Sequence, residues 1–290
     1  MKSEVNEVDE AKEVQGKSGF GAAFFDIDGT LLAKPSLEQR FFSELQRRGK
    51  IPARNYLHWL AETLRQAKTR RRGLRGLRAA VQTNKSYLRD VRAEIPFAAS
   101  ADHDSALVES WLPEFFPAAI QRVWWHALRG DAIVLVSGAL ASLAEIVQFA
   151  LERELLCRGV ECKISLIATK LEIADGCWTG GVAGEAILGE EKAFAAKEFA
   201  RTQNISLARC SAYGDSSLDR WMLAEVGHAF AVNPTWLLRR TARLRSWQIL
   251  HWTHCAVRTA GEQRSASEQR AASDRDGLKK SLKLKREAAR

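Results

Sequence analysis

A short apolar run, residues 22–25, stops abruptly at the polar sequence DIDGT, which begins at Asp26. Such a run before a turn signal predicts a strand that is buried on both faces, which is typical of a parallel sheet. Residues 133–136 and 211–213 form two more runs of this kind, and each also ends at a polar tip that contains glycine. We therefore expect an α/β fold with a Rossmann-like parallel sheet and a ligand site at the carboxyl ends of its strands.

The region between the first two runs differs in character from the rest. It carries long amphipathic stretches such as LEQRFFSELQRRG and few windows typical of a strand, which predicts an inserted helical cap. A more β-like stretch, residues 163–186, contains Asp175-Gly176 and predicts a strand and a hairpin. The expected organisation is a disordered tail at 1–18, a core at 19–35 and 129–255, the helical cap at 36–128, and a basic, flexible tail at 256–290.

Asp26 and Asp28 follow the first predicted strand, and Gly29 allows a sharp turn beside them. Carboxylates two residues apart project to the same side of an extended chain. One member of such a pair can attack or bind a metal while the other, in a different environment, transfers a proton. A surface Asp-x-Asp-Gly turn is the alternative interpretation, and the apolar run before the pair argues against it.

Ser137 and Gly138 follow the second predicted strand and precede a helical pattern over residues 140–156. A hydroxyl with free backbone N–H groups at a helix N-terminus can bind an anion. Taken alone, Ser137 is better explained as a helix N-cap.

Two further groups have local explanations when each is taken separately. Lys192 lies in a Gly-Glu-Glu-Lys sequence at the start of a helical run, where an exposed lysine commonly has no role. Asp215 and Asp219 lie four residues apart at a predicted strand-to-helix turn, with a helix expected over 217–225, and could be ordinary helix caps.

The four groups together are more specific than any one of them. Their order along the chain is DIDGT, VSG, Gly-Glu-Glu-Lys and GDSSLD, which resembles the four motifs of the haloacid dehalogenase (HAD) superfamily. The contexts FFDIDGTLL, LVSGAL, DGCWTG, AYGDSSLD and AVNP resemble the subclass IB hydrolases, which include the phosphoserine phosphatases. The resemblance extends over residues 21–234 and implies a HAD core with a C1-type helical cap.

The resemblance also implies a role for each residue. Asp26 would be the nucleophile that forms an aspartyl-phosphate, and Asp28 the general acid and base. Mg²⁺ would be held by Asp26, Asp215 and the backbone carbonyl of Asp28. Phosphate would be bound by Thr30, Ser137, Gly138 and Lys192, and Lys192 would also stabilise charge in the catalytic step. Thr30 would brace the turn that carries Asp28. Asp219 would orient Lys192 or a metal-bound water.

Two departures from the phosphoserine phosphatase pattern bear on the substrate. Those enzymes usually carry a glutamate shortly after the first motif that receives the substrate amino group. Here the first acid after that motif is Glu38, and Lys34 lies nearer. Leu218 stands where those enzymes commonly have asparagine. Phosphoserine is therefore a doubtful substrate, whereas the hydrolytic chemistry is unaffected.

The chain has a formal net charge of +9, and its basic residues are concentrated. Ten Lys or Arg and one Asp lie between Arg65 and Arg92, and Arg71, Arg75 and Arg78 fall at helical spacing. This segment could attract a phosphorylated substrate or an anionic membrane surface, or could be a solvated helix face. The tail from Gly261 has nine Lys or Arg against five Asp or Glu and could reinforce such a contact.

The function expected from these patterns is a Mg²⁺-dependent phosphomonoester phosphatase whose cap selects a small phosphorylated substrate. One alternative is a lipid-head-group phosphatase or phosphotransferase at a membrane surface. Another is a non-catalytic basic adaptor that binds RNA or membrane, although the four motifs argue against it and we do not expect a nucleic acid partner. The polar start of the chain and the lack of CxxC spacing favour a cytoplasmic protein, with a peripheral membrane location left open.

Overall fold

The computed structural model describes residues 20–69, 81, 83–93 and 114–253 of the chain. Their largest element is a six-stranded sheet with the order β3-β2-β1-β6-β7-β8, in which each pair of neighbours is parallel. Its strands are β1 (Ala22–Phe25), β2 (Ala132–Leu140), β3 (Ser165–Thr169), β6 (Ser211–Gly214), β7 (His228–Val232) and β8 (Gln248–Leu250). The α/β fold with a parallel sheet is confirmed.

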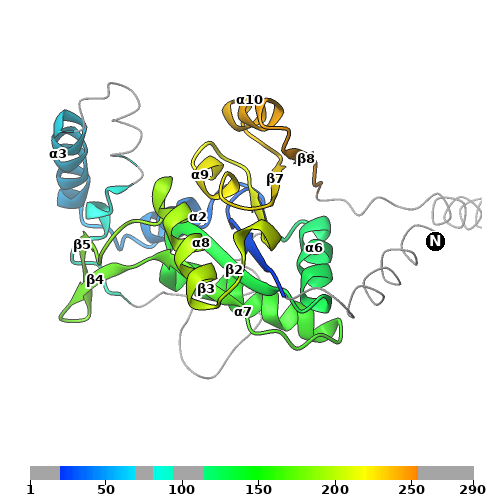
Figure 1. The fold of residues 1–290 in the computed structure, drawn as a ribbon. Helices are drawn as coiled ribbons and strands as arrows, with labels where there is room; N and C mark the ends of the chain where they lie inside the picture. The colour runs from blue at the N-terminus through cyan, green and yellow to red at the C-terminus, as the bar shows by residue number, and fades with distance from the viewer. Residues whose placement is uncertain (1–19, 70–80, 82, 94–113, 254–290) are drawn as a thin grey trace, which may run out of the picture. The chain divides into compact units, whose positions relative to one another are not determined.

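The alternating side chains of β1 enter two separate apolar clusters, because successive residues of a strand point to opposite faces. Ala23 and Phe25 pack in the cluster that contains α6 (Pro117–Leu128) and α7 (Ala141–Cys157). Ala22 and Phe24 pack in the other cluster. That cluster includes residues of α8 (Glu190–Thr202), α9 (Arg220–Leu223) and α10 (Trp236–Leu244). Helices therefore cover both faces of the sheet, which explains the continuous apolar run (Figure 1).

The insertion after β1 begins with α2 (Leu37–Arg47) and α3 (Ala53–Thr69), followed by the short 3₁₀ turn η2 (Ser86–Leu88). Ser36 starts α2 with a capping box, in which its hydroxyl accepts from the Gln39 N–H and the Gln39 side chain accepts from the Ser36 N–H. Buried Asn55 on α3 donates to the carbonyls of Tyr87 and Arg89, at 3.0 and 2.6 Å. These bonds attach α3 to the segment that contains η2.

The predicted hairpin is formed by β4 (Leu171–Ala174) and β5 (Cys177–Val182). Its turn residues Asp175 and Gly176 both have positive φ, as a two-residue hairpin turn requires. The chain after η2 pairs with β5, since Trp178 donates to the Val91 carbonyl at 2.9 Å and accepts from the Asp90 N–H at 2.9 Å. Figure 1 shows α3 and this hairpin at the same end of the described part.

The domain boundaries expected from the sequence remain a prediction. Within the described residues, α6 packs with α7 on the sheet, whereas the hairpin contacts η2. The expectations for both tails and for most of the basic segment fall outside the described residues, and so do Arg71, Arg75 and Arg78. No described helix is long and apolar enough to span a membrane.

Three local expectations differ from the structure. Strand β2 continues to Leu140, so α7 begins at Ala141 and has Leu140 at its N-cap position. The N-cap interpretation of Ser137 is therefore wrong. The helix expected over residues 217–225 is shorter, since α9 spans Arg220–Leu223, and strands β7 and β8 were not predicted.

Candidate active site

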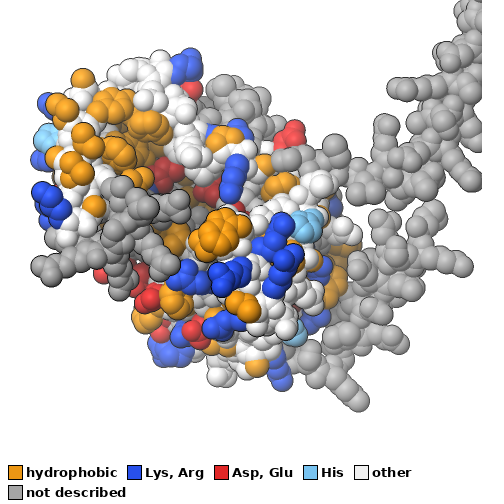
Figure 2. Space-filling view, turned by 90° about the horizontal axis from the view of Figure 1, so that it is seen from above, with side chains coloured by type: hydrophobic (Ala, Val, Ile, Leu, Met, Phe, Trp, Pro, Cys, Tyr) orange, Lys and Arg blue, Asp and Glu red, His pale blue; other side chains and the backbone are white. Residues whose placement is uncertain are grey.

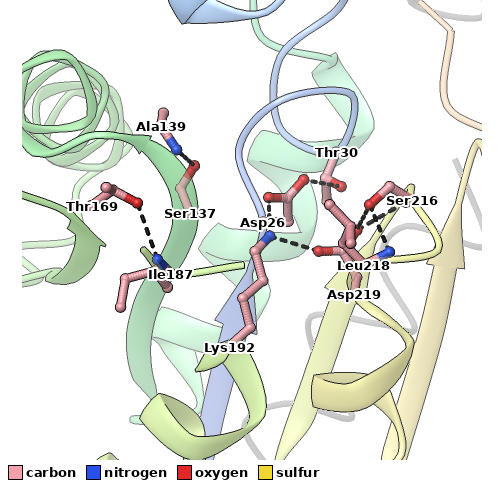
Figure 3. A network of polar contacts seen from close by, with 10 residues as sticks. All are labelled: Asp26, Thr30, Ser137, Ala139, Thr169, Ile187, Lys192, Ser216, Leu218 and Asp219. Carbon is pink, nitrogen blue, oxygen red and sulfur yellow. Dashed lines mark hydrogen bonds and ion pairs between the residues drawn. The ribbon is translucent and has the colours of Figure 1, made fainter. Parts of the chain in front are cut away.

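The ends of three neighbouring strands bring the predicted site residues together. Asp26 directly follows β1, Asp215 directly follows β6, and Ser137 lies near the end of β2. Strand β1 lies between β2 and β6, and the strand order runs in opposite directions from it, which is where open α/β sheets bind ligands. Lys192 reaches the same place from the first turn of α8 (Figure 3).

Lys192 connects two aspartates across the site. Its Nζ donates to Asp26 Oδ1 and to Asp219 Oδ1, both at 2.6 Å, although Lys192 and Asp26 are 166 positions apart in the sequence. All three side chains are buried. Because a buried charge is stable only with partners, Lys192 is a paired lysine and not the exposed one that its local sequence allowed. Its contacts with Asp219 and Asp26 outweigh burial and raise the pKa of Lys192, so the ammonium stays charged.

Asp219 is held from a second direction by the turn that carries it. Its Oδ2 accepts from the backbone N–H of Ser216 at 2.9 Å and from the Ser216 hydroxyl at 2.8 Å. The Asp219 carboxylate therefore has one oxygen fixed by its own turn and the other on Lys192. That Asp219 orients Lys192 during a reaction remains a prediction.

Asp26, Asp215 and Asp219 each place a carboxylate oxygen within 4.8 Å of the other two. Burial raises the pKa of Asp215 to about 6, with the Asp219 charge adding to the effect and Lys34 opposing it. Burial likewise holds the pKa of Asp26 well above its usual range, opposed by Lys192 and reinforced by Asp219 and Asp215. A cation among these oxygens would relieve the repulsion, and an all-oxygen, anionic donor set suits Mg²⁺.

The three-carboxylate cluster differs in one member from the expected ligand set. The sequence placed Asp28 among the ligands through its backbone carbonyl, whereas the cluster contains Asp219 beside Asp26 and Asp215. Both Asp219 oxygens accept hydrogen bonds, from Lys192 and Ser216, and both Asp26 oxygens accept them from Lys192 and Thr30, so all three carboxylates remain candidates for contact with a cation.

Asp28 lies in a different environment from Asp26. Its Oδ1 accepts from the Leu37 N–H at 2.8 Å, at the start of α2. Burial raises the pKa of Asp28 to about 6, against the opposing effect of that hydrogen bond. A carboxyl group with this pKa can hold a proton and release it near neutral pH, as a general acid and base must.

Thr30 and Gly29 shape the turn between the two aspartates. The Thr30 hydroxyl donates to Asp26 Oδ2 at 3.1 Å, and the Thr30 N–H donates to the Ile27 carbonyl at 3.3 Å within the turn. Gly29 has a φ of +90°, and a Cβ there would lie 2.5 Å from Asp215 Oδ2. Glycine is therefore required both by the positive φ of the backbone and by the close approach of the Asp215 carboxylate.

Ser137 and Gly138 line the same cavity as Asp26. The Ser137 hydroxyl accepts from the Ala139 N–H at 3.1 Å, and its side chain is buried. A Cβ at Gly138 would lie 2.3 Å from Leu188 Cδ2, so any residue other than glycine at this position would force Leu188 to move. The Ser137 hydroxyl is therefore held in place in the cavity that Asp26 also lines.

The structure also adds residues that the sequence did not assign to the site. Lys34 Nζ lies 3.2 Å from Asp215 Oδ2, and Ser216 holds Asp219. Lys85, which the sequence grouped with the basic segment, donates to Glu38 at 2.5 and 2.6 Å on the wall of the cavity. The Lys85 pairing joins residues 47 positions apart, and no local pattern indicates it.

The chain matches the family described as haloacid dehalogenase-like hydrolase over residues 23–224. It is 31% identical over 257 residues to a Streptomyces azureus protein named for inhibition of morphological differentiation, covering 79% of this chain and 77% of that one. It is 32% identical over 236 residues to a Mycobacterium tuberculosis protein named a probable phosphatase, covering 79% and 74%.

Solved structures agree on the fold. A Bordetella pertussis protein of unknown function aligns with a TM-score of 0.55 at 23% identity, covering 80% of this chain and 99% of that one. A phosphoserine phosphatase in a form described as a phospho-aspartyl intermediate analogue aligns with a TM-score of 0.52 at 18% identity, covering 81% and 94%. The match over residues 23–224 and the two relatives at 31% and 32% identity confirm the family that the motifs indicated: the chain belongs to the haloacid dehalogenase-like hydrolases.

Proposed function

We propose that the protein is a Mg²⁺-dependent phosphomonoester phosphatase that works through an aspartyl-phosphate on Asp26. The observation that carries this proposal is the buried contact of Lys192 with Asp26 and Asp219, at 2.6 Å each, beside the Asp215 carboxylate at the strand ends. The Asp26 carboxylate is thereby held in a fixed position, and the Lys192 ammonium group lies next to it. The phosphatase names of relatives also support the proposal.

In the first step, an oxygen of Asp26 attacks phosphorus as the bond from phosphorus to the substrate oxygen breaks. Asp28, whose pKa of about 6 leaves part of the population protonated near neutral pH, gives its proton to the leaving alkoxide. Lys192 and the Ser137 hydroxyl hold the transferred group, so its charge is balanced as it passes between oxygens.

In the second step, Asp28 is ionised and takes a proton from water, which attacks the aspartyl-phosphate. The bond between phosphorus and the Asp26 oxygen breaks, so phosphate leaves and the Asp26 carboxylate is restored. Asp26 and Asp215 would hold a Mg²⁺ ion, which would supply the charge neutralisation that an anionic carboxylate needs to approach an anionic phosphate. The chain's own residues perform the remaining work of positioning and proton transfer.

The cap would select the substrate, because α2 and α3 contribute to the wall of the cavity over Asp26. That cavity has a volume of about 790 Å³ and includes Phe42 from α2 and Trp59 from α3. The alternative of action at an anionic membrane surface depended on the basic segment and the tail, which lie largely outside the described residues. No described contact favours that alternative over a phosphatase acting on a free phosphomonoester.

The test is hydrolysis of p-nitrophenyl phosphate with and without Mg²⁺ by the wild type and by Asp26→Asn. We expect Mg²⁺-dependent turnover that falls at least about a thousandfold in the variant, since loss of a nucleophile removes the covalent route. Asp175→Asn is a matched control, because Asp175 is an exposed residue of the hairpin turn. Equal and metal-independent rates for the wild type and Asp26→Asn would contradict the proposal.

A further inference from the structure

The cavity over Asp26 has a polar floor and an apolar wall. The floor carries the aspartates, Lys192 and Ser137, whereas apolar and aromatic residues from the cap and the core line the wall: Phe42, Tyr56, Trp59, Val81, Leu188 and Leu218. Figure 2 shows hydrophobic side chains gathered beside a hollow in which acidic side chains are visible. A phosphate bound on the floor would therefore have its alcohol portion against apolar surface.

The aromatic part of the wall is a packed surface. The Phe42 ring meets Tyr87 edge-on at 5.2 Å between centroids and Tyr56 at 6.4 Å. Phe42 and Trp59 are half-buried, and Tyr56 keeps 39% of its surface exposed. Aromatic surface that remains accessible next to a reaction centre gains free energy when an apolar group covers it.

Among the residues that the structure describes, the wall offers no unpaired carboxylate to an ammonium group. Among the described lining residues, Glu38 is the only acid apart from the aspartates of the floor. Both of its oxygens accept from Lys85 Nζ, and one also accepts from the Tyr87 hydroxyl at 2.7 Å. Lys85 is buried, with 4% of its side chain exposed, so a substrate ammonium would have to displace a lysine that belongs to the packed structure.

From the apolar wall and the neutralised Glu38, we infer that the substrate is the phosphate monoester of an apolar alcohol, alkyl or aryl, and not of an alcohol with a free ammonium group. This inference rests on the proposed phosphatase function and specifies its substrate class. The phosphate occupies the floor, and the alkyl or aryl group lies between α2, α3 and the residues Leu188 and Leu218 of the core. The same chemistry is offered by a membrane lipid phosphate and by a soluble ester.

The experiment measures kcat/KM with Mg²⁺ for ethyl, butyl, hexyl and octyl phosphate and for O-phospho-L-serine, with p-nitrophenyl phosphate as the activity control. Burial of each methylene is expected to raise kcat/KM by up to about fourfold until the cavity is filled. Phosphoserine should be hydrolysed less efficiently than butyl phosphate. A flat chain-length series, or a preference for phosphoserine, would overturn the inference.

The double variant Tyr56→Ser with Val81→Ser replaces two accessible wall residues, and the ratio of octyl to ethyl kcat/KM should fall by about tenfold. Leu57→Ser is the matched control, because Leu57 lies next to Tyr56 on α3, is 73% exposed and does not line the cavity. The control should keep the wild-type ratio. Equal ratios in all three proteins would overturn the wall assignment, and the wild-type series tests the inference even if the double variant does not fold.

Two further readouts separate the questions. If p-nitrophenyl phosphate is hydrolysed but the chain-length series is flat, this inference fails and the proposed function stands; if no phosphomonoester is hydrolysed, both fail. Dodecyl phosphate presented in phosphatidylcholine vesicles distinguishes the two sources. Turnover that rises in vesicles supports a lipid phosphate, and turnover that falls there supports a soluble ester of the same class.

Discussion

Lys192 and Asp219 form a buried ion pair, with Nζ donating to Oδ1 at 2.6 Å. The same Nζ donates to the Asp26 carboxylate, and the other Asp219 oxygen is fixed by Ser216. Asp219 therefore holds Lys192 against the proposed nucleophile.

Asp219→Asn should lower kcat for p-nitrophenyl phosphate by about 10- to 100-fold, the range found when a group that orients a metal or phosphate ligand is lost. The asparagine can still accept from Ser216, so the turn is retained while the charge that holds Lys192 is lost. Kinetics and a thermal melt of the same sample test this, with Glu225→Gln, from the surface pair with Lys197, as a control of small effect. If kcat falls only in proportion to the folded fraction, Asp219 has a structural role.

Gly29→Ala should weaken Mg²⁺ binding as well as folding. A Cβ at Gly29 would lie 2.5 Å from Asp215 Oδ2 and would push that carboxylate from its place, in addition to the strain of a positive φ. Gly49→Ala is a matched control, since Gly49 also has a positive φ but nothing lies within 4 Å of a Cβ there. Both variants should lose about 1 kcal/mol of unfolding free energy from backbone strain. Only Gly29→Ala should need more Mg²⁺ for half-maximal activity, and an unchanged requirement would contradict the assignment of Asp215 as a ligand.

Lys85→Met should make Glu38 available to a substrate ammonium group. The KM for O-phospho-L-serine is then expected to fall by about tenfold, as a charge-assisted hydrogen bond allows, while KM for ethyl phosphate shows no such gain. Lys50→Met, at an exposed position of the same insertion, is the control. An unchanged ratio of the two KM values would show that Glu38 does not face the substrate.

Local sequence patterns predicted the strand tips because each one needs only a few neighbouring residues. The apolar run before Asp26 predicted a buried strand, and parallel strands necessarily bring their carboxyl ends to one edge, so Asp215 was expected near Asp26. Lys192 joined them only through the family resemblance, since Gly-Glu-Glu-Lys has no chemical signature of its own.

The surroundings of Ser137 and Lys85 depend on packing between segments that are distant in the sequence, and a local sequence pattern carries no information about such packing. Ser137 has the sequence context of a helix cap, yet its hydroxyl accepts from Ala139 because β2 continues beyond it. The basic charge of Lys85 counted toward a surface patch, whereas the fold buries it against Glu38. Strand β8 is three residues long and gave too short an apolar pattern to predict.

His126 is a buried residue of α6 that the sequence did not single out. Its Nδ1 lies 2.8 Å from Asp131 Oδ2 and its Nε2 2.8 Å from the Tyr213 hydroxyl, and Arg122 and Arg129 are the other charged groups that act on it. Burial lowers the pKa of His126 below its usual 6.5, against the opposing effect of Asp131. At this histidine the unfolded chain therefore binds a proton more readily than the folded chain. The contribution of neutral His126 to the free energy of unfolding is complete above about pH 6.5 and is lost as the pH falls below that value.

We expect the unfolding free energy of the wild type to fall relative to that of His126→Gln by up to about 1.4 kcal/mol per pH unit below pH 6.5. Glutamine keeps a polar group at the site but does not titrate, so groups that do not contact His126 contribute equally to both proteins and cancel in the difference. Asp131 does contact His126, but its pKa lies below its usual 3.8 in the folded wild type and so below the pH range measured. Urea unfolding at intervals from pH 8 to pH 5 measures it. Parallel curves for the two proteins would mean that His126 binds its proton equally well in the folded and unfolded states.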